Sequence, residues 1–176
     1  MSDRGTLLVM GVGNLLMGDE GVGVQVAQRL LAGPPLPPGV ELLDGGTGGF
    51  TLLEVLTRHP RALLVDACLD GRAAGTVRIR RPRHSGHFPT ALGAHDIGLR
   101  AMVEAAQLLG QLPRVTLVTV SVRLPFSMGL ELSPPVAAAV PRVEALVRRW
   151  VRRLGRLGAQ APPAHAAPSW GPVSRA

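Results

Sequence analysis

The sequence lacks several residue types that would indicate particular functions. Cys68 is the single cysteine among 176 residues, which excludes an internal disulfide and a multi-cysteine zinc site. With three Phe, two Trp and no Tyr, few rings are available to stack on nucleic-acid bases. The N-terminal apolar run is broken by glycines and acids, so it resembles neither a signal peptide nor a membrane span. We therefore expect a cytoplasmic protein that binds neither nucleic acid nor a membrane.

Negative charge is scarce only near the C-terminus. The formal net charge is +7, but residues 1–133 contain twelve Arg and eleven Asp or Glu, whereas residues 134–176 contain seven Arg and one Glu. The main body of the chain is therefore nearly neutral, and the excess charge lies on the last predicted helix and the tail. Such a basic run usually forms a solvated helix face, and binding of a partner is the alternative interpretation.

Strand-like and helix-like segments alternate through residues 1–157, which we expect to form a single domain. Alternating strands and helices predict an α/β fold in which a twisted, mostly parallel sheet lies between helices in three layers. Residues 158–176, rich in Ala and Pro, are expected to be a disordered tail. We expect strands at residues 7–12, 40–43, 62–65, 76–80 (an edge strand) and 115–120, and helices at residues 22–30, 50–59, from 95 onward and 134–154.

The most informative stretch is residues 7–28, where a buried strand leads into a glycine-rich loop and then a helix. Gly11 and Gly13 permit the backbone to turn where a side chain would crowd it. Asp19 and Glu20 stand just before the helix, where the helix dipole favours negative charge. A Rossmann-type phosphate loop would need a third glycine at the right distance, and two carboxylates would repel an anion. The loop therefore favours a cation over a phosphate.

Three successive predicted strands deliver acids or glycines to one edge of the sheet. In open α/β folds the binding site lies beyond the carboxyl ends of the strands, and here those ends lead into residues 13–20, residues 44–49 and Asp66. Glu20, Asp66 and His95 would give an oxygen and nitrogen ligand set that suits a divalent transition ion such as nickel or zinc. Taken singly, each has an ordinary structural interpretation, as a helix-start charge, a turn acid or a helix-start histidine.

Other polar residues near these loops are given structural roles. Cys68 is expected to be a small buried residue and not a nucleophile, because no cysteine-protease pattern surrounds it. His84 and His87 lie in a loop rich in Pro and Gly, where we expect them to be solvated. Asp44 and Thr47 are expected to shape the pocket, not to bind metal.

Four motifs of the chain resemble those of the NiFe-hydrogenase maturation endopeptidases. They are GVGNLLMGDEGVG at residues 11–23, LLDGGTGG at 42–49, LLVDA at 63–67 and AHDIGL at 94–99. Their order and spacing are similar to the family over residues 6–155. One motif alone would be weak, but four in register form a specific signal. The resemblance implies a five-stranded sheet between helices.

The resemblance also implies an activity. Members of this family remove a C-terminal extension from the hydrogenase large-subunit precursor after nickel insertion, and Glu20, Asp66 and His95 match their metal-binding residues. The resemblance therefore implies metal-assisted catalysis through these three residues, with no separate nucleophile assigned. Nickel is expected to arrive with the substrate protein, and zinc or cadmium could substitute for it. The free protein is expected to be monomeric. Residues 121–135 resemble the family's stretch before the last helix, but have RLP at 123–125 where an acid is common.

Three functions other than maturation of a hydrogenase are also compatible with parts of the sequence pattern. A metallochaperone-like or ligand-binding module could use the same pocket without cleaving anything. A nucleotide-binding α/β protein would share the fold. Peptidyl-tRNA hydrolases also begin with a strand and GxGN, but they need a catalytic histidine soon after that Asn, and here Leu15, Leu16 and Met17 follow it.

Overall fold

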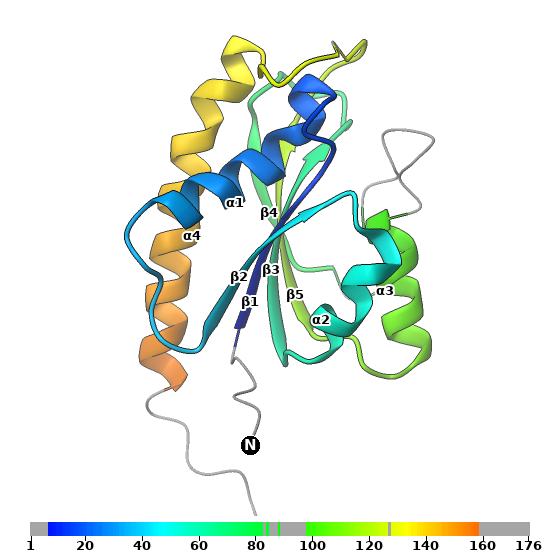
Figure 1. Ribbon diagram of the computed structural model, residues 1–176, viewed down its shortest axis with the longest axis vertical. Coiled ribbons are helices and arrows are strands. Elements are labelled where there is room, and N and C mark those ends of the chain that lie inside the picture. The colour runs from blue at the N-terminus through cyan, green and yellow to red at the C-terminus, as the bar shows by residue number, and fades with distance from the viewer. Residues whose placement is uncertain (1–6, 83, 85–87, 89–97, 127, 159–176) are drawn as a thin grey trace, which may run out of the picture.

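A five-stranded sheet separates two layers of helices (Figure 1). The computed structural model describes residues 7–82, 84, 88, 98–126 and 128–158. The strands are β1 (Leu7–Val12), β2 (Val40–Gly46), β3 (Arg61–Cys68), β4 (Val77–Arg80) and β5 (Arg114–Ser121). The helices are α1 (Val22–Ala32), α2 (Leu53–Thr57), α3 (Gly98–Leu108) and α4 (Pro134–Gly158), with two short 3-10 helices, η1 (Gly18–Gly21) and η2 (Gly49–Leu52).

The strands lie in the order β2-β1-β3-β5-β4. The first four of these are parallel to one another, and β4 pairs antiparallel with β5 at the edge of the sheet. Helices α1 and α4 cover one face, and α2 and α3 cover the other (Figure 1). The predicted α/β fold is therefore confirmed, as are its five-stranded, mostly parallel sheet and the edge strand.

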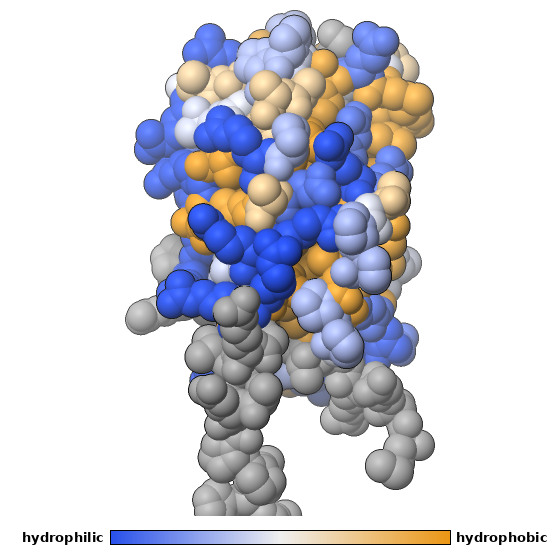
Figure 2. All heavy atoms as spheres, turned by 90° about the vertical axis from the view of Figure 1, so that its left-hand side faces the viewer, coloured by the Kyte–Doolittle hydropathy of each residue, from blue (hydrophilic) through white to orange (hydrophobic). Residues whose placement is uncertain are grey.

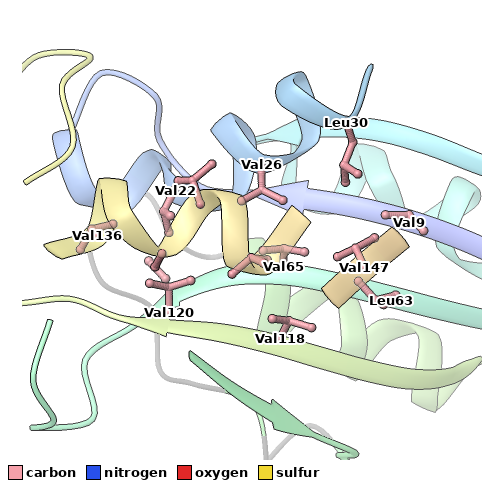
Figure 3. Close-up of a cluster of buried hydrophobic side chains, with 14 of the residues drawn as sticks. Val9, Val22, Val26, Leu30, Leu63, Val65, Val118, Val120, Val136 and Val147 are labelled. Atoms are coloured by element: carbon pink, nitrogen blue, oxygen red, sulfur yellow. The ribbon is translucent and has the colours of Figure 1, made fainter. Parts of the chain in front are cut away.

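The sheet is apolar on both faces because helices cover both. All six residues of β1 are buried. On one face, valines and leucines of β1, β3 and β5 contact α1 and α4 (Figure 3). Six of the labelled side chains show this packing: Val9, Leu63 and Val118 from the strands, and Val22, Val26 and Val147 from the helices. On the other face, Leu8, Met10 and Leu64 pack against Met102 and Val103 of α3.

Two glycines allow α1 to cross the sheet at very close range. A Cβ atom on Gly11 of β1 would lie 1.9 Å from the carbonyl oxygen of Gly23 in α1. A Cβ atom on Gly23 would lie 2.3 Å from the carbonyl oxygens of both Val12 and Val65. No side chain fits at either position, so the first turn of α1 lies directly on the ends of β1 and β3.

Some predicted element boundaries were wrong. The helix expected at residues 50–59 is a 3-10 turn followed by the five-residue helix α2. Strands β2, β3 and β5 are longer than predicted, and α4 continues to Gly158. The predicted helix start at His95 and the predicted tail beyond Gly158 lie outside the described residues.

Candidate functional site

The carboxyl ends of β1 and β3 meet next to η1. Gly11 of β1 pairs with Val65 of β3, so the loop after β1 leaves the sheet beside Asp66. Helix η1, which carries Glu20, directly contacts β3. Glu20 is buried, with 6% of its surface exposed, and Asp66 is half-buried. The fold therefore brings the elements that carry these two predicted ligands into contact, whereas His95 lies outside the described residues.

The loop before Glu20 is held by the segment that precedes α4. The backbone N–H and the hydroxyl of Ser133 donate to the two carboxylate oxygens of Asp19, at 2.6 and 2.7 Å. The Gly18 N–H donates to the Gly129 carbonyl at 2.9 Å, and the Gly129 N–H donates to the Leu16 carbonyl at 2.8 Å. Asp19 thus anchors η1 to residues 129–133. In the sequence Asp19 and Glu20 look alike, as helix-start charges, and this role of Asp19 was not predicted.

Asn14 shapes the same loop from within. Its side-chain oxygen accepts a hydrogen bond from the Leu16 N–H at 3.0 Å, and its carbonyl accepts one from the Met17 N–H at 3.1 Å. This is the turn that an Asn side chain forms readily with the backbone two residues later. The loop between β1 and η1 is therefore held at both ends by hydrogen bonds.

Asp44, at the end of β2, has a structural role, as predicted. One carboxylate oxygen accepts a hydrogen bond from the Gly46 N–H, and the other accepts one from the Gln28 amide, both at 3.0 Å. The first bond fixes the turn after β2, and the second connects that turn to α1. Thr47 in the same turn is exposed.

A row of polar side chains continues from Asp66 towards the sheet edge. Asp66 pairs with Thr119 of β5, which in turn pairs with Arg78 of β4. Thr119 is 1% exposed, and its hydroxyl has no hydrogen-bond partner in the described structure. The next pair on the same strand face, two residues along, is Cys68 and Ser121. This row was not predicted, although Thr119 and Ser121 alternate within an apolar run, as residues on one strand face do.

Cys68 is buried, as predicted, with 4% of its surface exposed. Burial raises the pKa of its thiol, and the negative charge of nearby Asp70 raises it further. A thiol with a raised pKa stays protonated near neutral pH, and a protonated thiol is a poor nucleophile. The electrostatics therefore agree with a structural role for this cysteine.

Asp70, just beyond β3, lies in a more basic environment. Its burial favours the neutral acid, but this effect is outweighed by hydrogen bonding and by the positive charges of Arg72 and Arg78, so its pKa is lowered. Carboxylate oxygens of Asp70 lie 3.3 Å from Arg72 Nε and 3.7 Å from Arg78 Nη1. These pairs connect the loop after β3 to the edge strand β4.

The histidines differ in their surroundings. His84 is exposed, as predicted, while His87 lies outside the described residues. His59 is 3% exposed, with Nδ1 2.8 Å from the Val55 carbonyl oxygen and Nε2 3.2 Å from a carboxylate oxygen of Glu41. It stands just before β3, at the opposite end of that strand from Asp66, and it is a structural residue there.

A cavity of about 490 Å³ opens beside Asp19. It lies between η1 and the segment that connects β5 to α4, and it combines acidic, basic and apolar walls. Among the residues that line it are Asp19, Arg123, Phe126 and Glu131. Described residues of the stretch 121–135, which resembles the family's segment before the last helix, therefore form one wall of this cavity next to the carboxyl edge.

The described residues lack two features, a preformed metal-binding cluster and a membrane-spanning helix. Among these residues no group of three or more His, Cys, Asp or Glu is placed so that it could hold a metal ion. Within the same ranges, no helix combines the length and the apolar character that crossing a bilayer requires.

Comparison with known proteins gives consistent results. Residues 24–150 match the family model for hydrogenase maturation proteases, HycI. The hydrogenase 2 maturation protease of Escherichia coli is 34% identical over 144 residues, which are 80% of this chain and 83% of that protein. The hydrogenase expression/formation protein HupD of Rhodobacter capsulatus is 34% identical over 155 residues, or 85% of this chain and 72% of that protein.

Solved structures show the same relationship. The hydrogenase maturating endopeptidase HybD of Escherichia coli superposes with a TM-score of 0.76 at 32% identity, over 85% of this chain and 93% of that one. A hydrogenase 2 maturation peptidase of a Thaumarchaeota archaeon gives 0.62 at 31% identity, over 85% and 97%. This chain therefore belongs to the hydrogenase maturation proteases, endopeptidases whose general function is the C-terminal processing of hydrogenase large subunits.

Proposed function

We propose that this protease removes the C-terminal extension of a NiFe-hydrogenase large-subunit precursor after nickel has been inserted, and that it recognises the nickel through Glu20, Asp66 and His95. The nickel belongs to the substrate, so it acts as a checkpoint: a precursor without nickel lacks part of the binding interaction. This reading requires three ligand side chains that converge on one ion.

The burial of Glu20 against β3 carries the proposal. An ordinary acid at a helix start is solvated, whereas Glu20 is 6% exposed and lies in a 3-10 helix that contacts the strand of Asp66. The close contact of Gly23 with Val12 and Val65 fixes this placement, because η1 directly precedes α1.

His95 would complete the ligand set. It precedes by three residues the point where the described part of α3 begins, at Gly98. Helix α3 packs against Leu64 of β3, and Asp66, two residues later on that strand, belongs to the same face. Two carboxylates and an imidazole suit a divalent transition ion, and three protein ligands leave positions for the ligands that the precursor supplies.

The chemistry of such a site follows from its ligands. A divalent ion held there can polarise a peptide carbonyl or lower the pKa of a bound water. Glu20 and Asp66 would orient the ion, and with it the polypeptide that the ion is attached to, so that the scissile bond is held in position. The cavity beside Asp19 would receive polypeptide next to that bond.

The test is a processing assay with purified precursor, with and without nickel. Cleavage is read as a loss of mass at the precursor's C-terminus. We expect Glu20→Gln, Asp66→Asn and His95→Ala to fold and to cleave nickel-loaded precursor at least about 100-fold more slowly. Glu54→Gln, which also removes one acid but at a side chain that is 83% exposed, should cleave normally.

The outcomes separate the alternatives. Normal cleavage by all three variants would refute the ligand assignment. Binding of nickel-loaded precursor by the wild type without any mass change would instead favour a metallochaperone-like module. Equal cleavage of precursor with and without nickel would refute the checkpoint while leaving the protease activity intact.

A further inference from the structure

A basic groove runs between the edge strand β4 and helix α4, on the sheet face that α4 covers. Its volume is about 790 Å³. Its apolar floor includes Ile79, which is 50% exposed. The groove is lined by Val77, Ile79, Ala145 and Leu146, together with Arg142, Arg149 and Arg152, and this set of residues is called the basic groove below.

No residue that the structure describes neutralises the positive charge of the basic groove. Arg142, Arg149 and Arg152 are exposed, and none of them has an ion pair with any residue that the structure describes. The acid of α4, Glu144, is already paired with Arg29 and Arg148. Figure 2 shows one face of the molecule, on which hydrophilic and hydrophobic residues lie side by side. The groove thus offers three positive charges beside an apolar floor.

Among the described residues, no strand pairs with the outer edge of β4, the strand beside the groove. β4 stands last in the sheet order and pairs with β5 on one side. The edge of a sheet is a template for an added extended segment, which gains backbone hydrogen bonds along it. Every second side chain of an added strand would point into the basic groove.

Charge decides what can occupy the groove. This chain's own C-terminal residues 159–176 contain one Arg and no acid, and a second copy of the chain would bring a net charge of +7. Neither is complementary to three arginines. We infer that the basic groove binds an extended segment of the large-subunit precursor with acidic and apolar residues in alternation, away from the scissile bond. This inference rests on the proposed function, since it names a second contact with the same substrate.

The first test separates binding from chemistry. The double variant Arg149→Ala/Arg152→Ala is compared with Arg114→Ala/Arg153→Ala, which loses the same charge at exposed arginines that do not line the groove. For nickel-loaded precursor we expect the groove variant to raise KM about 3- to 10-fold, as two partly solvated charge pairs would, with kcat changed by less than twofold. The control variant should match the wild type.

The second test needs no cleavage. The probe is a fluorescein-labelled peptide of alternating Glu and Val, and binding is followed by fluorescence anisotropy. Wild type should bind the peptide more tightly than the groove variant does. The difference in affinity should shrink in about 0.5 M NaCl, because salt screens the attraction between exposed charges. If wild type fails to cleave precursor yet binds this peptide in the groove, the proposed function is refuted, whereas binding of an acidic and apolar segment by the groove is still supported.

Three results would overturn the inference. The first is an equal rise in KM for both double variants, which would indicate a general effect of net charge. The second is equal peptide binding by wild type and the groove variant. The third is a wild-type dimer in light scattering that Arg149→Ala/Arg152→Ala abolishes, since the occupant would then be a second copy.

Discussion

Gly23→Ala gives the sharpest test of how the site is built. In a helix, alanine is favoured over glycine by about 1 kcal/mol, so helix propensity alone predicts that this change stabilises α1. The structure predicts that the change destabilises the fold, because the new Cβ would lie 2.3 Å from two backbone carbonyl oxygens, those of Val12 and Val65. Neither atom is the end of a flexible side chain, so α1 itself must move away from the sheet.

The magnitude follows from these two terms. Overpacking typically costs about 1–3 kcal/mol and occasionally more. A clash with two backbone atoms belongs at or beyond the upper end of that range, which leaves a net loss of about 1–3 kcal/mol once about 1 kcal/mol of helix propensity is subtracted. For a domain of this size that corresponds to a melting temperature lower by about 3–10 °C. Because η1 precedes α1, cleavage of nickel-loaded precursor should fall as well, even at temperatures where the variant is folded.

The measurement is thermal unfolding by circular dichroism, followed by the processing assay on folded protein. Gly71→Ala is the control: its φ is +74°, but no atom lies within 4 Å of its added Cβ. It should lose about 1 kcal/mol from backbone strain and retain full activity. A Gly23→Ala protein that melts at or above the wild-type temperature would refute the close contact between α1 and the strand ends.

Three further predictions test other parts of the structure. Asp19→Ala and Ser133→Ala should each destabilise the fold by about 1–3 kcal/mol. The double variant should lose less than their sum in urea unfolding, because Asp19→Ala already removes the hydrogen bond from the Ser133 hydroxyl that Ser133→Ala removes. The hydrogen bond from Arg29 lowers the pKa of Glu144 below the ordinary value of 4.5, so this carboxylate contributes stability above that pH and loses it on further acidification. The melting-temperature difference between wild type and Glu144→Gln should therefore shrink as the pH falls below 4.5, and a constant difference would contradict the assignment. Cys68 should react with a maleimide far more slowly in folded protein than in urea, and rapid labelling of folded protein would show that its thiol is neither buried nor protonated.

The main elements could be predicted because their signals are local. The apolar run of β1 begins and ends where the sequence indicates, and the edge strand β4 is recognisable from its alternation. The carboxyl-edge rule then correctly brings the elements of Glu20 and Asp66 together. Residue 95 lies outside the described residues, so its place in the ligand set stays a prediction.

The helix after β2 shows where local pattern fails. Apolar spacing predicts a helix at residues 50–59, but two threonine side chains bond to nearby carbonyls: Thr51 Oγ1 donates to Gly48 at 2.7 Å, and Thr57 Oγ1 donates to Leu53 at 2.9 Å. Pro60 also disfavours helical backbone at the residue before it, so the helix ends early. The result is a 3-10 turn and a helix of five residues.

Asp19 was beyond local reasoning for a different reason. Its hydrogen-bond partner Ser133 is 114 positions away, and no pattern near either residue connects them. Within the motif GDEG two adjacent acids look equivalent, yet one accepts hydrogen bonds from the segment before α4 while the other is buried beside β3. Only the tertiary fold distinguishes the anchor from the candidate ligand.

The glycines of the first motif explain why Asp19 and Glu20 differ in their surroundings. Locally they look like a phosphate loop, in which glycine lets the backbone approach an anion. Here Gly11 and Gly23 let a helix approach a strand, and what approaches the edge of the sheet is a carboxylate carried on η1. Because the contact is between backbones, it leaves almost no freedom in the distance between η1 and β3. The proposed recognition of one ion would need ligands held at fixed separation, and the glycine contact would supply that rigidity where a loop alone would not.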